Sequence, residues 1–321
     1  MYMLMYKFYF ILLRNKLKQK NKNSLCYHIS TKIIGYIEAY FNLYVVNHYK
    51  KNPSTKKGVT SQKRQQKVII SLTSYPKRIN TLWIVIETLL RQTMKPDEII
   101  LWLAEEQFKG MESLPSELLT QQKRGLTIRW CDDLKSHKKY FYVMQEYPED
   151  IIILVDDDTM YSYDLVEILM KTHKKNPEDI IGTACMIIPE DITKPPSVWT
   201  RPRMNERFIH SLFAQPFTGQ GTLYPPHSIP QNAFDKKMIM HICPYADDLW
   251  LKFLSMTTGT VVTLVWKYRG MPIAIYGTPA SSLWYINGQG GKNDIQWSAI
   301  LEQFKDDLEI LNKKIVSEVN S

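Results

Sequence analysis

Three consecutive aspartates, Asp156, Asp157 and Asp158, are the residues of this chain best suited to bind a metal ion. They follow directly after an apolar run, residues 151–155, and adjacent carboxylates repel one another unless a cation lies between them. Hard divalent cations prefer such oxygen ligands. If the chain stays extended, Asp156 and Asp158 point to one side and Asp157 to the other. We therefore expect Asp156 and Asp158 to share one metal ion and its ligand.

A simpler interpretation treats the three aspartates as a polar turn that caps the next helix. Ser162, however, stands just before the next helical pattern and can cap that helix itself. The carboxylates therefore exceed what capping needs, which favours the metal site.

Asp247 and Asp248 form a second acidic pair at the start of an apolar run with helical spacing. A carboxylate beside a hydroxyl can act as a general base, which contributes roughly 10²–10⁴-fold to a rate. The alternative is structural, because acidic residues in the first turn of a helix interact favourably with its dipole. The pair alone leaves both interpretations open.

Glycines and aromatic residues gather in two further segments. Residues 217–224 contain Gly219 and Gly221, which would let the backbone approach a sugar closely, although a plain turn is the alternative. Residues 284–294 contain Trp284, whose ring could stack on a sugar, and Lys292, which could neutralise a phosphate. A mobile lid and an ordinary surface loop fit this second segment equally well.

Two adjacent lysines, Lys138 and Lys139, follow the third predicted strand. An ammonium group can contact a diphosphate or a uridine, which makes both lysines candidates for ligand binding. Solvated lysines are the alternative, and the more common outcome.

Strands and helices alternate along residues 68–155. Short apolar runs predict strands at 68–72, 98–103, 126–130 and 151–155. Helical patterns lie between them, at 80–92 with Asn80 as its cap, at 115–122 and at 138–147. This alternation predicts an α/β fold with a doubly wound, mostly parallel sheet. Ligands of such sheets bind beyond the carboxyl ends of the strands, where the three aspartates stand.

The rest of the chain is less regular. After about residue 195 the sequence is rich in Pro, Gly and aromatic residues, with a helical pattern at about 295–304, and it suits an irregular acceptor-binding half. Residues 50–67, rich in Lys with Pro53 and Gly58, predict a flexible linker. We expect a basic, partly helical arm with its linker at 1–67, one domain at 68–310 and a tail at 311–321.

The order of these motifs resembles the nucleotide-sugar-dependent glycosyltransferases of the GT-A fold, which is Rossmann-like. An apolar strand that ends in Asp-x-Asp follows the first strand by about eighty residues, and residues 71–78 (Ser-Leu-Thr-Ser-Tyr-Pro-Lys-Arg) are similar to the donor-nucleotide loop of that class. The resemblance covers about residues 68–300. It points to the family 2-like enzymes that build bacterial surface polysaccharides.

The resemblance implies a role for each of the candidate residues. Asp158 would be the main ligand of Mn²⁺ or Mg²⁺, and Asp156 would face the metal or the nucleotide ribose. Asp248 would be the base and Asp247 its neighbour, at a position where the family often has Glu. The donor would contact Thr73, Ser74, Tyr75, Arg78, Lys139, Asp156, Asp157 and Lys292. Gly219, Gly221 and Trp284 would border the donor sugar and the acceptor.

The function that follows from the resemblance is metal-dependent hexosyl transfer from a UDP-sugar to a glycan or a lipid-linked acceptor, with inversion. A retaining transferase on the same fold is the first rival. A sugar nucleotidyltransferase is the second, although residues 71–78 lack the glycines that would cradle a triphosphate. A non-catalytic scaffold at a membrane surface is the third.

Positive charge is concentrated at the amino-terminal end. Residues 1–67 hold fourteen Lys and Arg against one acid, Glu38, whereas the remaining residues hold twenty-seven bases and thirty-one acids. Such a basic arm suits an anionic partner. Its apolar stretches, 1–13 and 33–46, are too short to span a bilayer but suit a helix at the interface of an anionic leaflet; a packing helix with a solvated linker is the equal alternative.

We therefore expect a cytoplasmic protein with peripheral contact at the inner face of the cell membrane. No nucleic-acid-binding module accompanies the charge, so we expect no nucleic-acid partner. The four cysteines are too scattered for a zinc ribbon or a disulfide framework. The sequence contains no P-loop, dinucleotide-binding, zinc-hydrolase or serine-hydrolase motif. Its 321 residues suffice for a sizeable core.

Overall fold

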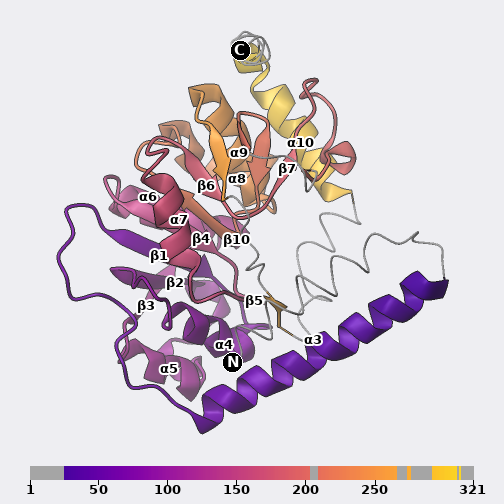
Figure 1. Cartoon of the computed structure of the whole chain (residues 1–321). Helices are drawn as coiled ribbons and strands as arrows, with labels where there is room; N and C mark the ends of the chain where they lie inside the picture. Colours follow the sequence, from indigo (N-terminus) through magenta and orange to yellow (C-terminus); the bar gives the residue numbers. More distant parts are fainter. Residues whose placement is uncertain (1–24, 203–208, 266–272, 276–290, 309–310, 312–321) are drawn as a thin grey trace.

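The computed structural model describes residues 25–202, 209–265, 273–275, 291–308 and 311 (Figure 1). The described chain contains an eight-stranded sheet in the order β3-β2-β1-β4-β10-β6-β11-β8. Its strands are β1 (Val68–Thr73), β2 (Glu98–Ala104), β3 (Leu126–Cys131), β4 (Ile151–Val155), β6 (Ile180–Gly182), β8 (His210–Ser211), β10 (Gln220–Tyr224) and β11 (Val262–Leu264). Two small sheets pair β5 (Thr159–Met160) with β12 (Ile273–Ala274), and β7 (Cys185–Ile187) with β9 (Ala214–Pro216).

The large sheet is mixed but mostly parallel. Strands β3, β2, β1 and β4 form a parallel block, and β6 and β11 are parallel to each other. Strand β10 is antiparallel to β4 and β6, and β8 is antiparallel to β11. The predicted α/β class and mostly parallel sheet are thus confirmed. Strand β4 spans the predicted residues, and each of β1, β2 and β3 extends one residue beyond its prediction.

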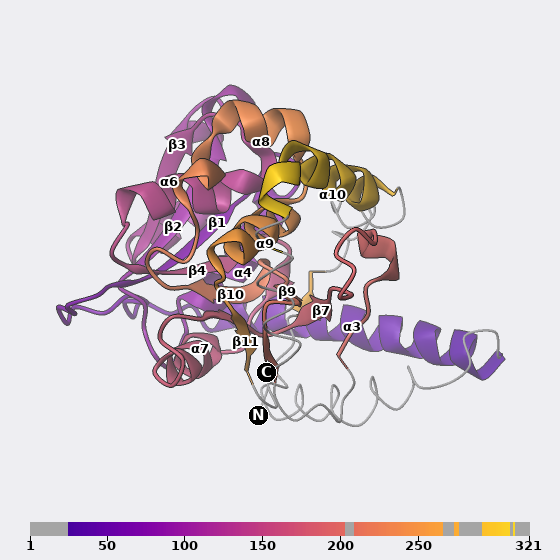
Figure 2. The ribbon, with the colours of Figure 1, turned by 90° about the horizontal axis from the view of Figure 1, so that it is seen from above.

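Helices cover both faces of the sheet (Figure 2). The helices are α3 (Leu25–Lys51), α4 (Ile79–Leu89), α5 (Ser116–Gln122), α6 (Lys138–Glu146), α7 (Leu165–His173), α8 (Lys236–Ile242), α9 (Asp247–Thr258) and α10 (Lys292–Gln303). Short 3₁₀ turns lie at Glu105–Gln107, Met111–Ser113, Lys135–His137, Pro196–Val198 and Gln231–Phe234.

Two hydrophobic cores follow from the alternation of side chains along the strands. In β1, Val68, Ile70 and Leu72 face the core that contains residues of α3, α4, α5 and α7. Ile69 faces the other core, which contains residues of α6, α8, α9 and α10. Because β1 and β4 are buried on both faces, they consist of nearly continuous apolar residues.

Two predicted helix caps are wrong. Helix α4 begins at Ile79, so Asn80 lies inside its first turn, and Arg78 is the residue at the cap position. Asp164 stands at the cap position of α7, and the Ser162 hydroxyl donates to its carboxylate. A polar side chain shortly before a helix can therefore bind the side chain at the cap position rather than the helix backbone.

The predicted flexible linker is also wrong. Helix α3 extends to Lys51, and the segment that follows is hydrogen-bonded to the domain. The Gly58 amide donates to the Arg124 carbonyl oxygen at 2.8 Å, and the Arg64 guanidinium lies 2.8 Å from the Asp97 carboxylate. The basic side chains of this segment are not all solvated, because Arg64 pairs with Asp97 and Lys67 pairs with Glu98. None of the described helices has the length and apolar character needed to cross a membrane.

Candidate functional site

The three aspartates lie immediately beyond the carboxyl end of β4, beside the loop that follows its parallel neighbour β1. The Ser74 hydroxyl donates to Asp157 Oδ2 at 2.5 Å. The Arg78 guanidinium donates to Asp157 Oδ1 at 2.5 Å and lies 3.0 Å from Asp158 Oδ2. The two segments singled out in the sequence therefore meet, because parallel strands bring their carboxyl ends to the same sheet edge.

The aspartates do not alternate as an extended chain would. Asp157 and Asp158 both contact Arg78, whereas Asp156 contacts Lys139 on the neighbouring helix α6. The predicted alternation depends on an extended chain, and β4 ends at Val155, so it does not apply beyond that residue. The charge of Asp156 still acts on the Asp158 carboxyl, and the metal ion that these two residues are expected to share stays a prediction.

Thr73 and Tyr75 support this arrangement from either side of Ser74. The Thr73 hydroxyl donates to the Trp102 carbonyl oxygen at 2.8 Å, so it fastens the end of β1 to β2. The Tyr75 ring centre lies 5.5 Å from the Arg78 guanidinium carbon, which is the distance of a cation–π contact. Both side chains help to position the loop.

Lys139 joins the two acidic clusters of the sequence. Its ammonium group lies 2.7 Å from Asp156 Oδ1 and 3.0 Å from Asp247 Oδ2. The Lys139 side chain is only 4% exposed, whereas that of Asp156 is 44% exposed. Burial alone would lower the pKa of Lys139, but the two carboxylates outweigh it and raise this pKa above its usual value. Lys139 therefore remains charged.

Asp247 is held as a carboxylate at the start of α9. It accepts a hydrogen bond from the Thr218 hydroxyl at 2.8 Å, in addition to the contact with Lys139. Burial would raise the pKa of Asp247, but the charge and hydrogen bond of Lys139, together with interactions from His137 and Ser136, outweigh burial and lower this pKa. The buried His137 stands nearby, and burial lowers the pKa of its imidazole to about 4.

Asp248 has a different environment. Its side chain is partly exposed, and its Oδ2 accepts a hydrogen bond from the Gln215 amide at 3.2 Å. Burial and the negative charge of Asp247 raise the pKa of Asp248 to about 7. Two adjacent carboxylates therefore differ in proton affinity, which is the pattern expected when one of them exchanges a proton near neutral pH.

The two glycines of residues 217–224 are required for different reasons. A Cβ atom at Gly219 would lie 1.6 Å from Asp156 Oδ2, so only glycine leaves room for that carboxylate. Gly221 has φ +95° at an irregularity in the pairing of β10 with β4, and its missing side chain leaves room for Leu165. Only Gly219 therefore lies against the carboxylates.

The aspartates after β4 fit a divalent cation in part. Burial and the charge of Asp156 raise the pKa of Asp158 to about 7, so the two carboxylates repel each other as they stand. Mg²⁺ and similar ions are commonly held by one or two carboxylates together with phosphate oxygens, and Asp156 and Asp158 could supply such a pair. Across the described residues, no group of three or more His, Cys, Asp and Glu side chains is arranged to hold a metal.

The remaining predicted residues are spread more widely. Lys292 begins α10, and its ammonium group lies 4.9 Å from the ring centre of Tyr245, two residues before Asp247. Lys138 points away from the carboxylate site and pairs with Asp133 at 2.6 Å. Trp284 lies outside the described residues.

No known family model matches this chain. A search of curated proteins likewise finds no match. The functional argument therefore depends on the geometry of the carboxylate site, by which we mean Ser74, Arg78, Lys139, Asp156, Asp157, Asp158, Gln215, Thr218, Gly219, Asp247 and Asp248.

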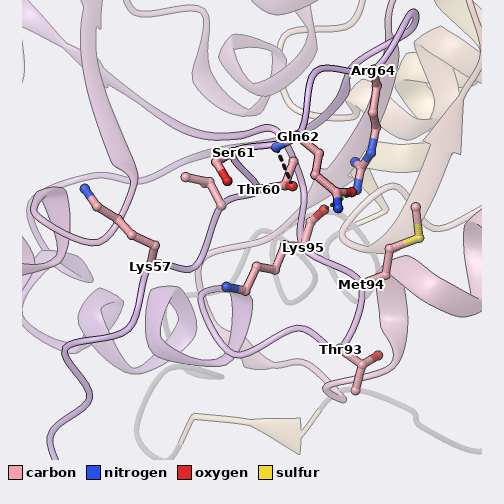
Figure 3. Close-up of a pocket in the computed structure, with 9 residues that line it drawn as sticks. Lys57, Thr60, Ser61, Gln62, Arg64, Thr93, Met94 and Lys95 are labelled. Atoms are coloured by element: carbon pink, nitrogen blue, oxygen red, sulfur yellow. Dashed lines mark hydrogen bonds between the residues drawn. The ribbon is translucent and has the colours of Figure 1, made fainter.

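A pocket of about 580 Å³ lies elsewhere, between the segment after α3 and the loop before β2 (Figure 3). Its lining includes Lys57, Arg64 and Lys95. The Arg64 guanidinium is already engaged by the Asp97 carboxylate and the Lys95 carbonyl oxygen. Because this pocket adjoins the amino ends of the strands, it is separate from the carboxylate site at their carboxyl ends.

Three residues of the site region were not predicted. Thr218 lay within a segment chosen for its glycines, and its hydroxyl proves to contact Asp247. Gln215 and His137 carry no recognisable spacing, because a lone amide or imidazole is most often structural. Only the fold brings them beside the acidic pair.

Proposed function

We propose that this protein is a metal-dependent glycosyltransferase that moves a sugar from a nucleotide sugar to a hydroxyl group of a glycan or lipid-linked acceptor, with inversion at the anomeric carbon. The observation that carries the proposal is the double ion pair of Lys139, which joins the aspartates after β4 to those at the start of α9. Inverting transfer needs both groups of carboxylates, one for the donor and one for the acceptor.

On the donor side, Asp156 and Asp158 would hold Mn²⁺ or Mg²⁺, which when bound would stabilise the departing diphosphate. Arg78 orients Asp157 and Asp158, and Ser74 fixes Asp157 from the β1 loop. Tyr75, Thr73 and Lys292 would complete the donor site. Uridine as the donor base follows from the resemblance of residues 71–78 alone.

On the acceptor side, Asp248 is the better base of the pair. Its partial exposure gives an acceptor access, and its pKa of about 7 allows it to take a proton near neutral pH. Asp247 stays ionised beside Lys139, and its charge increases the proton affinity of Asp248. The acceptor hydroxyl would give its proton to Asp248 while its oxygen attacks the anomeric carbon opposite the leaving diphosphate, which inverts the configuration.

Thermal unfolding with a panel of nucleotide sugars, with and without Mn²⁺, tests the donor side. A ligand that binds only the folded state raises the melting temperature. We expect a metal-dependent rise with one donor. The absence of any rise across the panel would contradict the proposal and favour the non-catalytic scaffold.

Asp248→Asn tests the acceptor side. This variant should lose turnover while it keeps the nucleotide-induced rise in melting temperature, and the exposed Asp306→Asn provides the matched control. Turnover that survives in Asp248→Asn would remove this residue from the base role. The anomeric configuration of the product, measured by NMR, separates inversion from the rival retaining reaction.

A further inference from the structure

Helix α3 has two apolar faces, and only one of them packs on the protein. Phe41, Val45 and Tyr49 are buried in the core. Another set of apolar side chains follows at alternating spacings of four and three residues, which places them on one side of the helix. This set, the outer face of α3, consists of Ile29, Ile33, Tyr36, Tyr40 and Leu43.

The outer face is strongly exposed. Tyr36 is 78% exposed, Leu43 is 66% exposed and Tyr40 is 63% exposed. Five of the seven exposed large apolar side chains among the described residues belong to this face. The helix has 27 residues and is about 40 Å long, and it runs along the outside of the described molecule (Figure 1). The outer face occupies residues 29–43 of this helix, about 21 Å of its length, and a contiguous exposed apolar stripe of this kind marks a binding surface.

Charge identifies the partner. The only acid among residues 1–67 is Glu38, whereas fourteen Lys and Arg lie within, before and after the helix. A second copy of the chain would bring the same excess of positive charge, so pairing of two outer faces would be opposed by repulsion. An anionic lipid surface attracts this charge, and tyrosines are favoured at the level of the lipid headgroups.

We propose that the outer face of α3 binds the surface of an anionic membrane, with the helix lying in the plane of the interface. Isoleucine and leucine side chains enter the headgroup region, and the surrounding lysines contact lipid phosphates. The cytoplasmic leaflet carries such negative charge, which agrees with the expected location at the inner face of the cell membrane.

Helix α3 also adjoins the carboxylate site. The Asn42 side-chain amide donates to the Ala274 carbonyl oxygen at 3.1 Å, and the next residue, Ile275, donates its backbone amide to the Asp158 carbonyl oxygen at 2.8 Å. Strand β12 thus links the helix to the aspartates. If the proposed function holds, the bound membrane lies near the site, and an acceptor anchored in that membrane is the substrate class this arrangement serves.

Flotation of the full chain with lipid vesicles tests the membrane proposal without any sugar donor. We expect binding to vesicles that contain phosphatidylglycerol, weaker binding to pure phosphatidylcholine, and loss of binding as salt is added. Ile33→Ser/Leu43→Ser leaves the charge unchanged and should weaken vesicle binding at least about tenfold. The reason is that burying one such apolar side chain in the membrane raises the binding constant by more than about tenfold. Val198→Ser/Ile295→Ser removes equally exposed apolar groups elsewhere and should bind as the wild type does.

Three results would overturn the membrane proposal. The first is no binding of the wild type to anionic vesicles, and the second is equal binding of both double variants. The third is a wild-type dimer, seen by light scattering, that Ile33→Ser/Leu43→Ser converts to a monomer, because the outer face would then bind a second copy. Near-ultraviolet circular dichroism checks that the variants are folded. Since no nucleotide is present, these results are independent of the proposed transferase activity.

Discussion

Replacing Lys139 with methionine should destabilise the protein through a single buried charge. The substitution keeps the length of the side chain but removes the ammonium group between Asp156 and Asp247. The Asp156 side chain is 44% exposed, so water can solvate its charge. Asp247, whose side chain is 7% exposed, would keep a charge without an ionic partner.

Breaking a buried ion pair by removing one partner costs about 3–5 kcal/mol, whereas an exposed pair contributes about 0–1 kcal/mol. We therefore expect Lys139→Met to lower the free energy of unfolding at neutral pH by about 3–5 kcal/mol, nearly all of it from Asp247. Adding Asp247→Asn removes the stranded charge, so the double variant should be more stable than Lys139→Met alone.

The loss of unfolding free energy in Lys139→Met should also be smaller in acid than at neutral pH. In the wild type the pKa of Asp247 is lower in the folded state than in the unfolded state, where it is about 3.9. The difference stabilises the fold at pH values above the unfolded pKa, and this stabilisation is lost as the pH falls through the folded pKa. In Lys139→Met burial instead raises the pKa of Asp247, so the folded state gains stability as it binds a proton. Urea unfolding at neutral pH and at about pH 5 measures the difference.

Lys138→Met is the matched control. Lys138 is the adjacent residue of α6, and its ion pair with Asp133 is equally buried. Asp133 also contacts Lys135, so this variant should lose less stability, and Asp247→Asn should not restore it. A loss below about 1 kcal/mol in Lys139→Met, or a further loss on adding Asp247→Asn, would refute the reasoning.

Three other outcomes are expected. Gly219→Ala must displace the Asp156 carboxylate, so it should abolish the Mn²⁺-dependent rise in melting temperature, whereas Gly35→Ala, with no atom near its Cβ position, should not. Turnover should increase as pH rises through about 7, because Asp248 must lose its proton to act as base; a flat profile in the wild type would contradict that role. Arg78→Met should lower the free energy of unfolding in urea by about 3 kcal/mol. Arg78→Lys should restore only part of this stability, because an ammonium group cannot contact Asp157 and Asp158 through two nitrogen atoms as the guanidinium does. Full restoration would show that charge alone suffices.

Strands β1, β2 and β4 were predictable because they are buried on both faces, and β3 because it is a short, largely apolar run, whereas β6, β8, β10 and β11 of the same sheet were not predicted. Residues 151–155 are all apolar, which predicts a buried strand, and β4 spans the same residues. Helix starts were less predictable, although Asn80 and Ser162 both have side chains that suit a cap. Asn80 lies inside the first turn of α4, and Ser162 binds the Asp164 side chain. Cap choice depends on tertiary neighbours that a local pattern does not contain.

The acids of the site and Lys139 were candidates from the sequence, but the two ion pairs that Lys139 makes with Asp156 and Asp247 were not predictable. Asp-rich segments at the ends of strands and helices can be recognised in the sequence. Nothing in the sequence indicates which partners Lys139 binds or distinguishes it from the adjacent Lys138. Only the packing of α6 against the sheet buries one of them between Asp156 and Asp247 and turns the other toward Asp133. The same packing brings Gln215 and Thr218 to the acidic pair.

Ser74 and Asp157 are 83 residues apart in the sequence, and the ion pair of Lys139 with Asp247 joins residues that are still further apart. A ribosome delivers these groups in order, so a nascent chain that has emerged only through the aspartates after β4 contains Lys139 and Asp156 but lacks Asp247. The carboxylate site cannot be completed before α9 has been synthesised, because Asp247 and Asp248 belong to that helix. Nonsense mutations between Asp156 and Asp247 would therefore yield products in which Lys139 lacks one of its two carboxylate partners.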